Sequence, residues 1–530
     1  MASRNFSWLE GKVARLDNAI LNRHFYITTP IYYPNGEPHL GTVYTTIAAD
    51  AIARRHRLAG EKTFFLTGTD EHGIKMVKTA AAEGIEPQAL VDRNVAVFES
   101  LWKELEISND DFIRTTSQRH KAATQEIVRK LVSTGDIYLG SYSGWYDEGQ
   151  EEFVTETDAK ASEYKSPISG RPLTRYSEPS YFFRLGKYAP RVLDHIERHE
   201  DFIRPQSRRN EIISKLKLGV EDLSISRQSL TWGIPLPNDP SHVLYVWIDA
   251  LSNYITALGY GSSDPTLFNE FWPADVHLIG KDILWFHTVY WPAILMALNL
   301  PLPRTVMAHG WWTSGGRKMS KSLGNFVELA KIRQMAADHS LDAVRYYLLR
   351  AGPFGADLDF NDADFAKAFS ELADVLGNCL NRVVKMTGRY RGGILPAEGE
   401  KIDHQLPGQT AALAAQVADA WDKLELHHCA TLPIELARAT NGFFDATTPW
   451  KLGKDPAQAG KLDTVLNWSA QAVYQALLAL LPILPAKAAQ GLRQLGVDVT
   501  GKNVANLPPV LSAGTRFGEG NPLFPKIQGQ

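Results

Sequence analysis

The chain has 530 residues, of which 44% are hydrophobic and 22% are charged, and its formal net charge at neutral pH is −3. A single hydrophobic core does not grow to this length, so we expect about two to four domains. A net charge so close to zero gives the whole molecule no general attraction for nucleic acid, and an RNA partner would have to bind a local basic face.

The same totals restrict the cellular setting. The only two cysteines, Cys379 and Cys429, exclude a disulfide framework and a cysteine-based zinc knuckle. The longest apolar run that we find, "ALLALLPILPA" at 476–486, is too short to span a bilayer and contains two prolines. The first twenty residues contain Glu10 and Asp17 and no continuous apolar segment, so we expect no secretory signal and a cytoplasmic protein without a membrane partner. For residues 1–22 a disordered tail and an organellar address both stay open.

Strand-like and helical segments alternate in the first part of the chain. The β-rich stretch "HFYITTPIYY" (24–33) ends in the turn-forming "PNGEPHLG", and a helical stretch with Gly60 at its end follows. "KTFFLTG" (62–68) is typical of a buried strand. Strand, helix and strand in this order predict a βαβ unit of a parallel sheet.

The strand pattern returns later, at 242–250, 275–280 and 304–310. We therefore expect an α/β fold with a doubly wound, Rossmann-like parallel sheet. From about residue 362 the segments are rich in Ala and Leu at helical spacing, which predicts an all-α bundle. The expected limits are 1–22 for an N-terminal extension, 23–115 and 236–303 for the two halves of the doubly wound domain, 116–235 for an insertion into it, 304–361 for a region around a lysine-rich loop, and 362–530 for the bundle.

Polar residues collect where the predicted strands end, which is where open parallel sheets bind ligands. "HLGT", His39 to Thr42, follows the first strand and begins a helix, whose free N–H groups suit an anion. Asp70 follows the second strand, and Gly280, Asp282 and His287 follow a later one. Each has a plainer interpretation: "HLGT" as a turn, Asp70 as a helix cap and His287 as a core histidine.

A lysine-rich loop, "GRKMSKSLGNF" at 316–326, adds Lys318 and Lys321, compact charges that suit the β- and γ-phosphates of a nucleotide. Alone, such a loop is usually a solvated surface. The order "HLGT", strand-end Asp, "GKD" and "KMSKS" along one doubly wound pattern favours a nucleotide site, and neither of the common glycine-rich phosphate motifs competes with it.

With these motifs the sequence resembles the methionyl-tRNA synthetases, a family of class I aminoacyl-tRNA synthetases. "HLGT" and "KMSKS" match its two signatures, and "FFLTGTDEHG", "VLYVWIDALSNYI", "HLIGKDILWFH" and "NPLFPKI" also look like it. The resemblance covers about residues 24–450. It implies a Rossmann-like catalytic domain with a connective insertion, followed by a helical anticodon-binding domain.

The resemblance also implies roles for single residues. His39, Thr42, Lys318 and Lys321 match catalytic positions, and the ATP contacts match His39, Gly41, Gly280, Asp282, Lys318 and Lys321. The methionine pocket matches Ile31, Tyr33, Asp70, Trp247, Ala250, Tyr254, Ile283 and His287. The anticodon readers match Asn378, Arg382 and Trp450.

Two departures from the family pattern accompany these matches. The last signature position is usually a second histidine and here is Thr42, whose hydroxyl still donates a hydrogen bond. The insertion has "GWYDEGQEEFVTE" where many relatives have zinc-binding cysteines, so we expect no metal site and no structural zinc. The additional C-terminal domain of dimeric relatives does not follow the bundle, so we expect a monomer.

The implied reaction is the ATP-dependent ligation of methionine to tRNA. L-methionine and ATP with Mg²⁺ would form methionyl-adenylate, and the acyl group would pass to initiator and elongator tRNA(Met), with no DNA partner. Two alternatives stay open. One is a related synthetase for leucine, isoleucine, valine or cysteine, and the other is a non-enzymatic tRNA-binding protein derived from a synthetase. The pocket residues disfavour the first, and the intact "KMSKS" disfavours the second.

Overall fold

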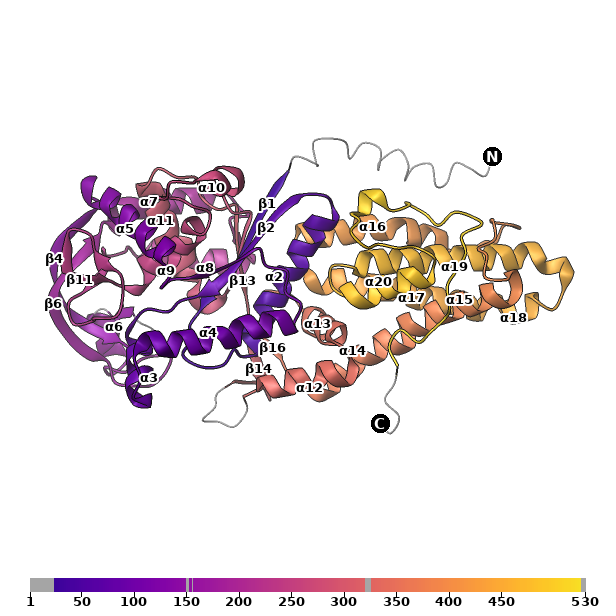
Figure 1. The fold of residues 1–530 in the computed structure, drawn as a ribbon, viewed down its shortest axis with the longest axis horizontal. Coiled ribbons are helices and arrows are strands. Elements are labelled where there is room, and N and C mark those ends of the chain that lie inside the picture. The colour runs from indigo at the N-terminus through magenta and orange to yellow at the C-terminus, as the bar shows by residue number, and fades with distance from the viewer. Residues whose placement is uncertain (1–22, 149–151, 155, 320–325, 526–530) are drawn as a thin grey trace. The chain divides into compact units, whose positions relative to one another are not determined.

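The computed structural model describes residues 23–148, 152–154, 156–319 and 326–525 (Figure 1). The chain forms two compact units. The first, which we call the sheet unit, comprises Tyr26–Pro38 and Phe64–Ala308. The second, which we call the helical unit, contains His39–Thr63 and the chain from His309 onward. The domain limits expected from the sequence stay predictions.

A six-stranded sheet with the order β3-β2-β1-β12-β13-β7 forms the centre of the fold. β1 pairs with β12, β2 with β3 and β13 with β7, all in parallel, which confirms the predicted doubly wound class. β7 comes from the range expected for the insertion. The strands are β1 (His24–Tyr32), β2 (Lys62–Thr69), β3 (Asp111–Arg114), β7 (Ile203–Arg204), β12 (Val276–Gly280) and β13 (Thr305–His309).

The sequence forms this sheet because its strands are apolar on both faces. In β1 the residues from Phe25 to Pro30 are all buried, as is typical of parallel strands covered by helices. Thr28 lies level with His277 in the pairing of β1 with β12. Three residues further along both strands, the same register places Ile31 level with Gly280, at the carboxyl ends where the strand order reverses.

The structure corrects the prediction of a strand at 242–250. The strand β11 (Asp239–Leu244) ends early and belongs to a small antiparallel sheet with β9 (Ser226–Arg227) and β10 (Pro235–Leu236). The helix α9 (Val246–Thr256) begins two residues later. The run "HVLYVWIDA" is apolar throughout, and continuous apolar runs do not distinguish a buried strand from a buried helix.

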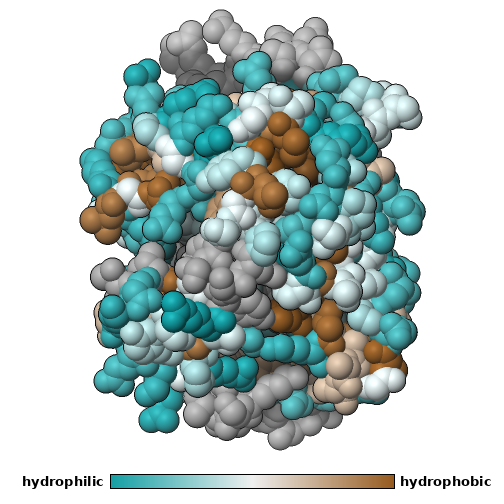
Figure 2. Space-filling view, turned by 90° about the vertical axis from the view of Figure 1, so that its left-hand side faces the viewer, coloured by the Kyte–Doolittle hydropathy of each residue, from teal (hydrophilic) through white to brown (hydrophobic). Residues whose placement is uncertain are grey.

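The rest of the insertion is mainly antiparallel, because β4 and β6 pair along most of their length. Its sheet has the order β5-β4-β6-β8, with β4 (Ile137–Asp147), β5 (Glu152–Val154), β6 (Thr174–Phe183) and β8 (Leu223–Ser224). Figure 2 views this end of the molecule and shows hydrophobic residues in small patches separated by hydrophilic ones. The exposed large hydrophobic side chains of the sheet unit include Leu139, Ile168 and Leu218.

Helices connect and cover the strands of the sheet unit. Their bounds are α3 (Ile74–Glu83), α4 (Pro87–Glu104), α5 (Gln118–Ser133), α6 (Glu156–Ala161), α7 (Leu185–Arg198), α8 (Gln206–Leu216), α9 (Val246–Thr256), α10 (Thr266–Phe271) and α11 (Trp291–Ala297). Between β12 and α11 the chain forms a 3-10 turn at Lys281–Ile283 and a π-helical turn at Phe286–Tyr290. The π-helical turn contains His287, and π-turns of this kind often occur at functional sites.

The helical unit begins with α2 (Leu40–Leu58) and continues with a small sheet of order β15-β14-β16, formed by β14 (Trp312–Ser314), β15 (Arg317–Lys318) and β16 (Leu358–Asp359). Helices dominate from residue 362, as predicted (Figure 1). The helices α12 (Leu329–His339) and α13 (Leu341–Arg350) precede this residue. Those that follow include α14 (Asp362–Ser370), α15 (Asn378–Arg391), α16 (Leu406–Asp422), α17 (Leu426–Thr447), α18 (Pro449–Leu452), α19 (Ala459–Leu480) and α20 (Pro485–Gln494). In the described part of the chain, no helix has the length and apolar content to cross a membrane.

A buried ion pair joins α2 to the helices that follow it. Asp50 of α2 and Arg345 of α13 are both fully buried, with 2.7 Å between Oδ2 and Nη2. Arg345 also donates through Nε to the carbonyl oxygen of Ile483 at 3.0 Å. Because a buried charge without its partner is costly, this pair holds α2 against the bundle and so determines where "HLGT" lies within the helical unit.

We predict that Arg345→Met lowers the free energy of unfolding by about 1.5–3 kcal/mol, because the buried Asp50 carboxylate loses Arg345 and keeps its 2.7 Å pair with Arg54. Urea unfolding followed by circular dichroism measures the change. The control is Lys331→Met, which breaks the exposed pair with Asp362 and should cost about 1 kcal/mol or less. Equal losses for the two variants would contradict the importance of the buried pair.

Candidate active site

His39 caps the helix that carries the first signature. Its backbone is extended, and its Nδ1 accepts a hydrogen bond from the backbone N–H of Thr42 at 3.3 Å. In the neutral ring this places the proton on Nε2. A side chain at Gly41 would approach the His39 ring to 3.0 Å, so the glycine keeps the space beside the imidazole open.

Thr42 is buried in the first turn of α2, with 4% of its surface exposed. Three residues further along α2, the hydroxyl oxygen of Thr45 lies 2.6 Å from Nε2 of His309, the last residue of β13. The signature turn is therefore held to the strand end that leads into the lysine-rich loop. The His39 ring also meets the ring of Phe326 edge-on, with centroids 6.5 Å apart. Phe326, the first described residue after 320–325, thus lies beside the signature histidine.

The lysine-rich loop starts from a tight antiparallel hairpin. Gly315 and Gly316 have φ values of 62° and 70°, a left-handed conformation that favours glycine. Thr313 pairs with Lys318 across this hairpin. β15 ends at Lys318. Lys321 lies outside the described residues.

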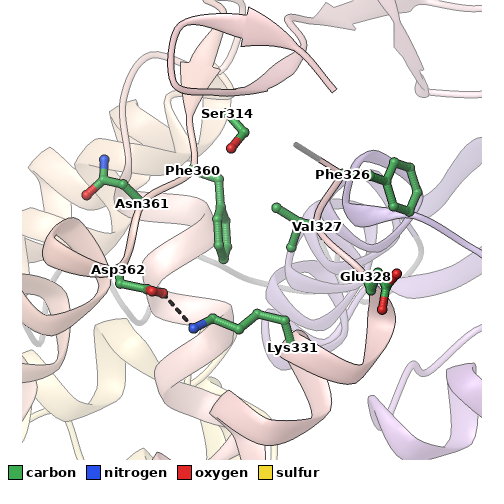
Figure 3. A pocket seen from close by; sticks show the side chains of 8 residues that line it. All are labelled: Ser314, Phe326, Val327, Glu328, Lys331, Phe360, Asn361 and Asp362. Carbon is green, nitrogen blue, oxygen red and sulfur yellow. Dashed lines mark ion pairs between the residues drawn. The ribbon is translucent and has the colours of Figure 1, made fainter. Parts of the chain in front are cut away.

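A pocket of about 440 Å³ opens next to this loop (Figure 3). Val327 and Phe360 provide apolar surface on two sides of it, and Lys331 reaches across to Asp362 with 2.8 Å between Nζ and Oδ1. All of its residues belong to the helical unit: Ser314, Phe326, Val327, Glu328, Lys331, Phe360, Asn361 and Asp362. The pocket thus lies beside Phe326 and Val327, the first described residues after 320–325.

In the sheet unit, Asp70 follows the last residue of β2 and is buried, with 4% of its surface exposed. Its backbone N–H donates to the carbonyl oxygen of Tyr32 at the end of β1. The helix-cap interpretation is wrong, because α3 begins at Ile74 and its N-cap is Gly73. The Asp70 carboxylate therefore serves a purpose other than capping.

Four residues of the predicted methionine pocket meet in one apolar cluster. Ile31, Tyr33 and Trp247 pack against a buried group that includes Ala250. The same group contains Tyr146 of β4 and Tyr245, whose hydroxyl groups are hydrogen-bonded to each other. The insertion thus contributes a wall to the cluster, which the sequence did not indicate.

Trp247 stacks face to face on Phe286, with ring centroids 3.5 Å apart and an interplanar angle of 8°. Phe286 lies in the π-helical turn and is buried. The sequence analysis did not select Phe286, although it lies between the selected Ile283 and His287. The pair forms a flat, polarizable surface of the kind that favours contact with a thioether sulfur.

Tyr254 and His287 form a buried hydrogen bond of 2.7 Å between Oη and Nε2. The Nδ1 of His287 lies 3.0 Å from the carbonyl oxygen of Ile283, which can only accept, so Nδ1 carries a proton. Burial lowers the pKa of His287 to about 4, more than its hydrogen bond to that carbonyl raises it. The ring is therefore neutral at pH 7, and Tyr254 donates to Nε2.

The remaining predicted residues divide between the two units. Gly280 ends β12, and Asp282 is exposed in the 3-10 turn that follows it. Asn378 is exposed at the start of α15, and Trp450 of α18 has 39% of its surface exposed. Arg382 pairs with Asp445 of α17 at 3.3 Å, so a base that it binds has to compete with this carboxylate.

Among the described residues no group of three or more His, Cys, Asp or Glu side chains is placed to hold a metal ion. Both cysteines are buried, free thiols in α15 and α17, away from the sequence of the insertion.

The family model described as tRNA synthetases class I (M) matches residues 25–163 and 157–384, which include both signature motifs. This chain belongs to that family. Among its relatives, the Methionine--tRNA ligase of Halalkalibacterium halodurans is 44% identical over 519 residues, which cover 95% of this chain and 78% of the relative. The Methionine--tRNA ligase of Caldanaerobacter subterraneus is 46% identical over 512 residues, covering 96% and 79%.

Solved structures of the family agree with this assignment. Mycobacterium tuberculosis methionyl-tRNA synthetase in complex with methionyl-adenylate has a TM-score of 0.90 to this chain at 39% identity, over 95% of this chain and all of that one. The apo form of that synthetase has a TM-score of 0.84 at 37% identity, over 96% and 99%. The resemblance stated from the sequence is thus confirmed for family and fold.

For this member of the family we predict that acid destabilises the fold partly through His287. Its pKa in the folded chain is about 4, below the ordinary value of 6.5, so between these values the unfolded chain binds a proton that the folded chain does not. This contribution to stability is complete above pH 6.5 and falls as the pH drops. From pH 7.5 to 5 the loss is about 2 kcal/mol.

Urea unfolding of His287→Gln and of the parent chain at pH 7.5 and pH 5 measures the contribution of His287 to the pH dependence of stability. The parent should lose about 2 kcal/mol more than the variant between the two pH values. His428→Gln, at an exposed histidine, is the control and should behave as the parent does. An unchanged pH dependence in His287→Gln would contradict the assignment.

Proposed function

We propose that the chain is a methionine–tRNA ligase. It activates L-methionine with ATP to methionyl-adenylate and transfers the methionyl group to the 3′ end of tRNA(Met), initiator and elongator. The observation that carries this proposal is the apolar cluster of Ile31, Tyr33, Trp247 and Ala250 together with the buried Asp70, whose backbone N–H donates to the carbonyl oxygen of Tyr32, the residue between Ile31 and Tyr33. An amino acid substrate with an apolar side chain requires an apolar surface for that side chain and a carboxylate for its ammonium group.

Methionine binding divides between charge and shape. Asp70 binds the α-ammonium group, because a carboxylate and an ammonium group form a strong charge-assisted hydrogen bond. The side chain lies against the stacked Trp247 and Phe286, with Ile283 and the Tyr254–His287 pair as further walls. A neutral His287 suits this role, because a thioether has no charge to compensate. Shape then provides most of the selectivity, since the thioether is a weak hydrogen-bond acceptor.

Activation needs no nucleophile from the protein. A carboxylate oxygen of methionine attacks the α-phosphorus, an O–P bond forms, and the bond from this phosphorus to the bridging oxygen breaks. Negative charge moves onto the departing pyrophosphate, where His39, Thr42, Lys318 and Lys321 stabilise it. Gly41 and Gly280 let backbone approach the nucleotide, and Asp282 accepts hydrogen bonds from ribose. ATP enters as its Mg²⁺ complex, the usual form of a triphosphate substrate.

The second step uses the adenylate as the acyl donor. A ribose hydroxyl of the terminal tRNA adenosine attacks the carbonyl carbon, and AMP leaves. At the other end of the tRNA, Trp450 stacks on an unpaired anticodon base, and Asn378 and Arg382 read base edges. The exposure of Trp450 and Asn378 supports these roles.

The proposal extends to the state of the protein. We expect a monomer that works in the cytoplasm and contains no structural zinc. The insertion lacks thiolate donors, and the buried thiols of Cys379 and Cys429 are unsuited to a metal because burial raises the pKa of both.

ATP–pyrophosphate exchange measured with each of the twenty amino acids tests the function. We predict exchange with methionine alone, because the cluster fits a linear apolar chain and Asp70 requires a free ammonium group. Asp70→Asn should raise the KM for methionine about tenfold or more through loss of a charged hydrogen bond, and leave the KM for ATP unchanged. Exchange with leucine, isoleucine, valine or cysteine in place of methionine would support the first alternative, and no exchange at all would support the second.

Aminoacylation with altered tRNA tests the anticodon residues. We predict that Trp450→Ala lowers kcat/KM for tRNA(Met) about 10-fold to 100-fold, because stacking of one base contributes about 1–3 kcal/mol. Exchange without tRNA should be unchanged, which controls for folding and for the methionine site. A tRNA(Met) with a different anticodon should be charged poorly by the parent chain, and the Trp450 variant should lose part of this discrimination. Equal charging of both tRNAs by the parent would contradict the assignment.

A further inference from the structure

A carboxylate shared by two histidines lies behind the methionine cluster. Asp249 is fully buried, and its two oxygens contact different rings: Oδ2 lies 2.6 Å from Nδ1 of His72, and Oδ1 lies 2.8 Å from Nε2 of His120. Nδ1 of His120 lies 2.7 Å from the hydroxyl of Thr256. These four side chains are at most 3% exposed. None of them was selected from the sequence, and none contacts the predicted pocket residues through these bonds.

The direction of each hydrogen bond follows from the charge of Asp249. Burial raises the pKa of this carboxyl group, but the two histidines lower it further, to about 2. An ionised carboxylate only accepts, so Nδ1 of His72 and Nε2 of His120 both carry protons and donate. When the His120 ring is neutral, its other nitrogen accepts from Thr256. The four residues then form one directed chain in which each bond fixes the orientation of the next group.

The helix α9 places this chain and the methionine cluster on opposite faces. Trp247, Ala250 and Tyr254 have the spacing i, i+3, i+7 and share one face. Asp249 and Thr256 are seven residues apart and share another, which the advance of about 100° per residue puts roughly opposite. The network therefore contacts the face of α9 opposite the methionine cluster. It does so through Asp249 in the first turn and through Thr256 in the last turn.

The partners of α9 in this network belong to two other elements. His120 belongs to α5, which packs on α9. His72 lies two residues after Asp70, in the loop between β2 and α3. The same loop is held at Glu71, whose carbonyl oxygen accepts a hydrogen bond from Nε1 of Trp232 at 2.7 Å. Through the His72–Asp249 contact, the helix that carries the aromatic wall is joined to the loop that carries the ammonium-binding carboxylate.

Other charged groups near His72 are already compensated. The Glu71 carboxylate is fully buried and accepts from Arg114 at 2.8 Å and from the hydroxyl groups of Thr69 and Thr116. Asp249 therefore serves as the carboxylate of the two histidines while Glu71 binds separate donors. The two acids occupy one buried region with distinct sets of partners.

We propose that Asp249, His72, His120 and Thr256 form a positioning group for methionine, which sets the distance between the α9 wall and Asp70. The proposal rests on the methionine site proposed above. An apolar replacement of a buried polar network often preserves stability, and what is lost is the single orientation that directed hydrogen bonds impose. A pocket that selects by shape needs this orientation, because small displacements of its wall change the fit of one methylene group.

The test uses a matched pair of substitutions at the outer end of the network. Thr256→Ser keeps the hydroxyl that donates to His120, and Thr256→Val keeps the branched shape but removes that hydroxyl. We predict that Thr256→Val raises the KM for methionine in ATP–pyrophosphate exchange about threefold to tenfold, as expected for loss of one buried hydrogen bond. Thr256→Ser should behave like the parent chain. The KM for ATP should be the same in the two variants, whereas the unfolding temperature of Thr256→Val should be lower, because Nδ1 of His120 is left buried without this donor.

A purely structural role would instead change the KM values for methionine and for ATP together in Thr256→Val, and this result would overturn the proposal. Equal KM values for methionine in the Val and Ser variants would also overturn it. Asp249→Asn, if it folds, should raise the KM for methionine further, because an amide presents an N–H to one of two donating rings. The Thr256 pair decides the question if it does not fold.

Trp247→Ala separates this proposal from the one on which it rests. A raised KM for methionine in Trp247→Ala, with no difference between the Thr256 variants, overturns the positioning group and leaves the methionine site intact. An unchanged KM in Trp247→Ala overturns the site itself, and the positioning group with it.

Discussion

Parallel pairing of β1 with β12 is the constraint on which the sheet unit depends. It joins segments that are 249 residues apart in sequence, as the 2.8 Å contact between Thr28 and His277 illustrates. Parallel strands bring their carboxyl ends to the same edge, so Ile31 and Gly280 become neighbours. Everything that recognises methionine in our proposal is attached to this edge or to α9, which packs beside it.

Burial of polar groups is the second device in the same unit. His287 is neutral because burial lowers its pKa, and a neutral ring can accept from Tyr254. Asp249 is ionised although it is buried, because two rings donate to it. One buried site thus holds an uncharged ring in the pocket wall, and another holds a charged carboxylate behind it. The difference comes from the partners that surround each group, since both are fully buried.

The sequence analysis predicted some features well because they depend on local patterns. The start of α2 follows from "HLGT" before a helical stretch, and the helices after residue 362 follow from their periodicity. It was wrong about 242–250, where an apolar run fits a strand and a buried helix equally. The plainer alternative for Asp70, a helix cap, is excluded because the helix begins only after Gly73. The π-helical turn at Phe286–Tyr290 has no signal that we recognise in the sequence.

By itself the sequence determined the family, the order of the elements and the residue types available at the strand ends, because motifs and periodicity are properties of neighbouring residues. Only the tertiary structure decided which distant groups meet. The stack of Trp247 on Phe286, the bond from Tyr254 to His287 and the sharing of Asp249 between His72 and His120 join residues far apart in the chain. Such pairs depend on how whole elements pack, and packing is settled by the summed burial of many side chains rather than by any local pattern.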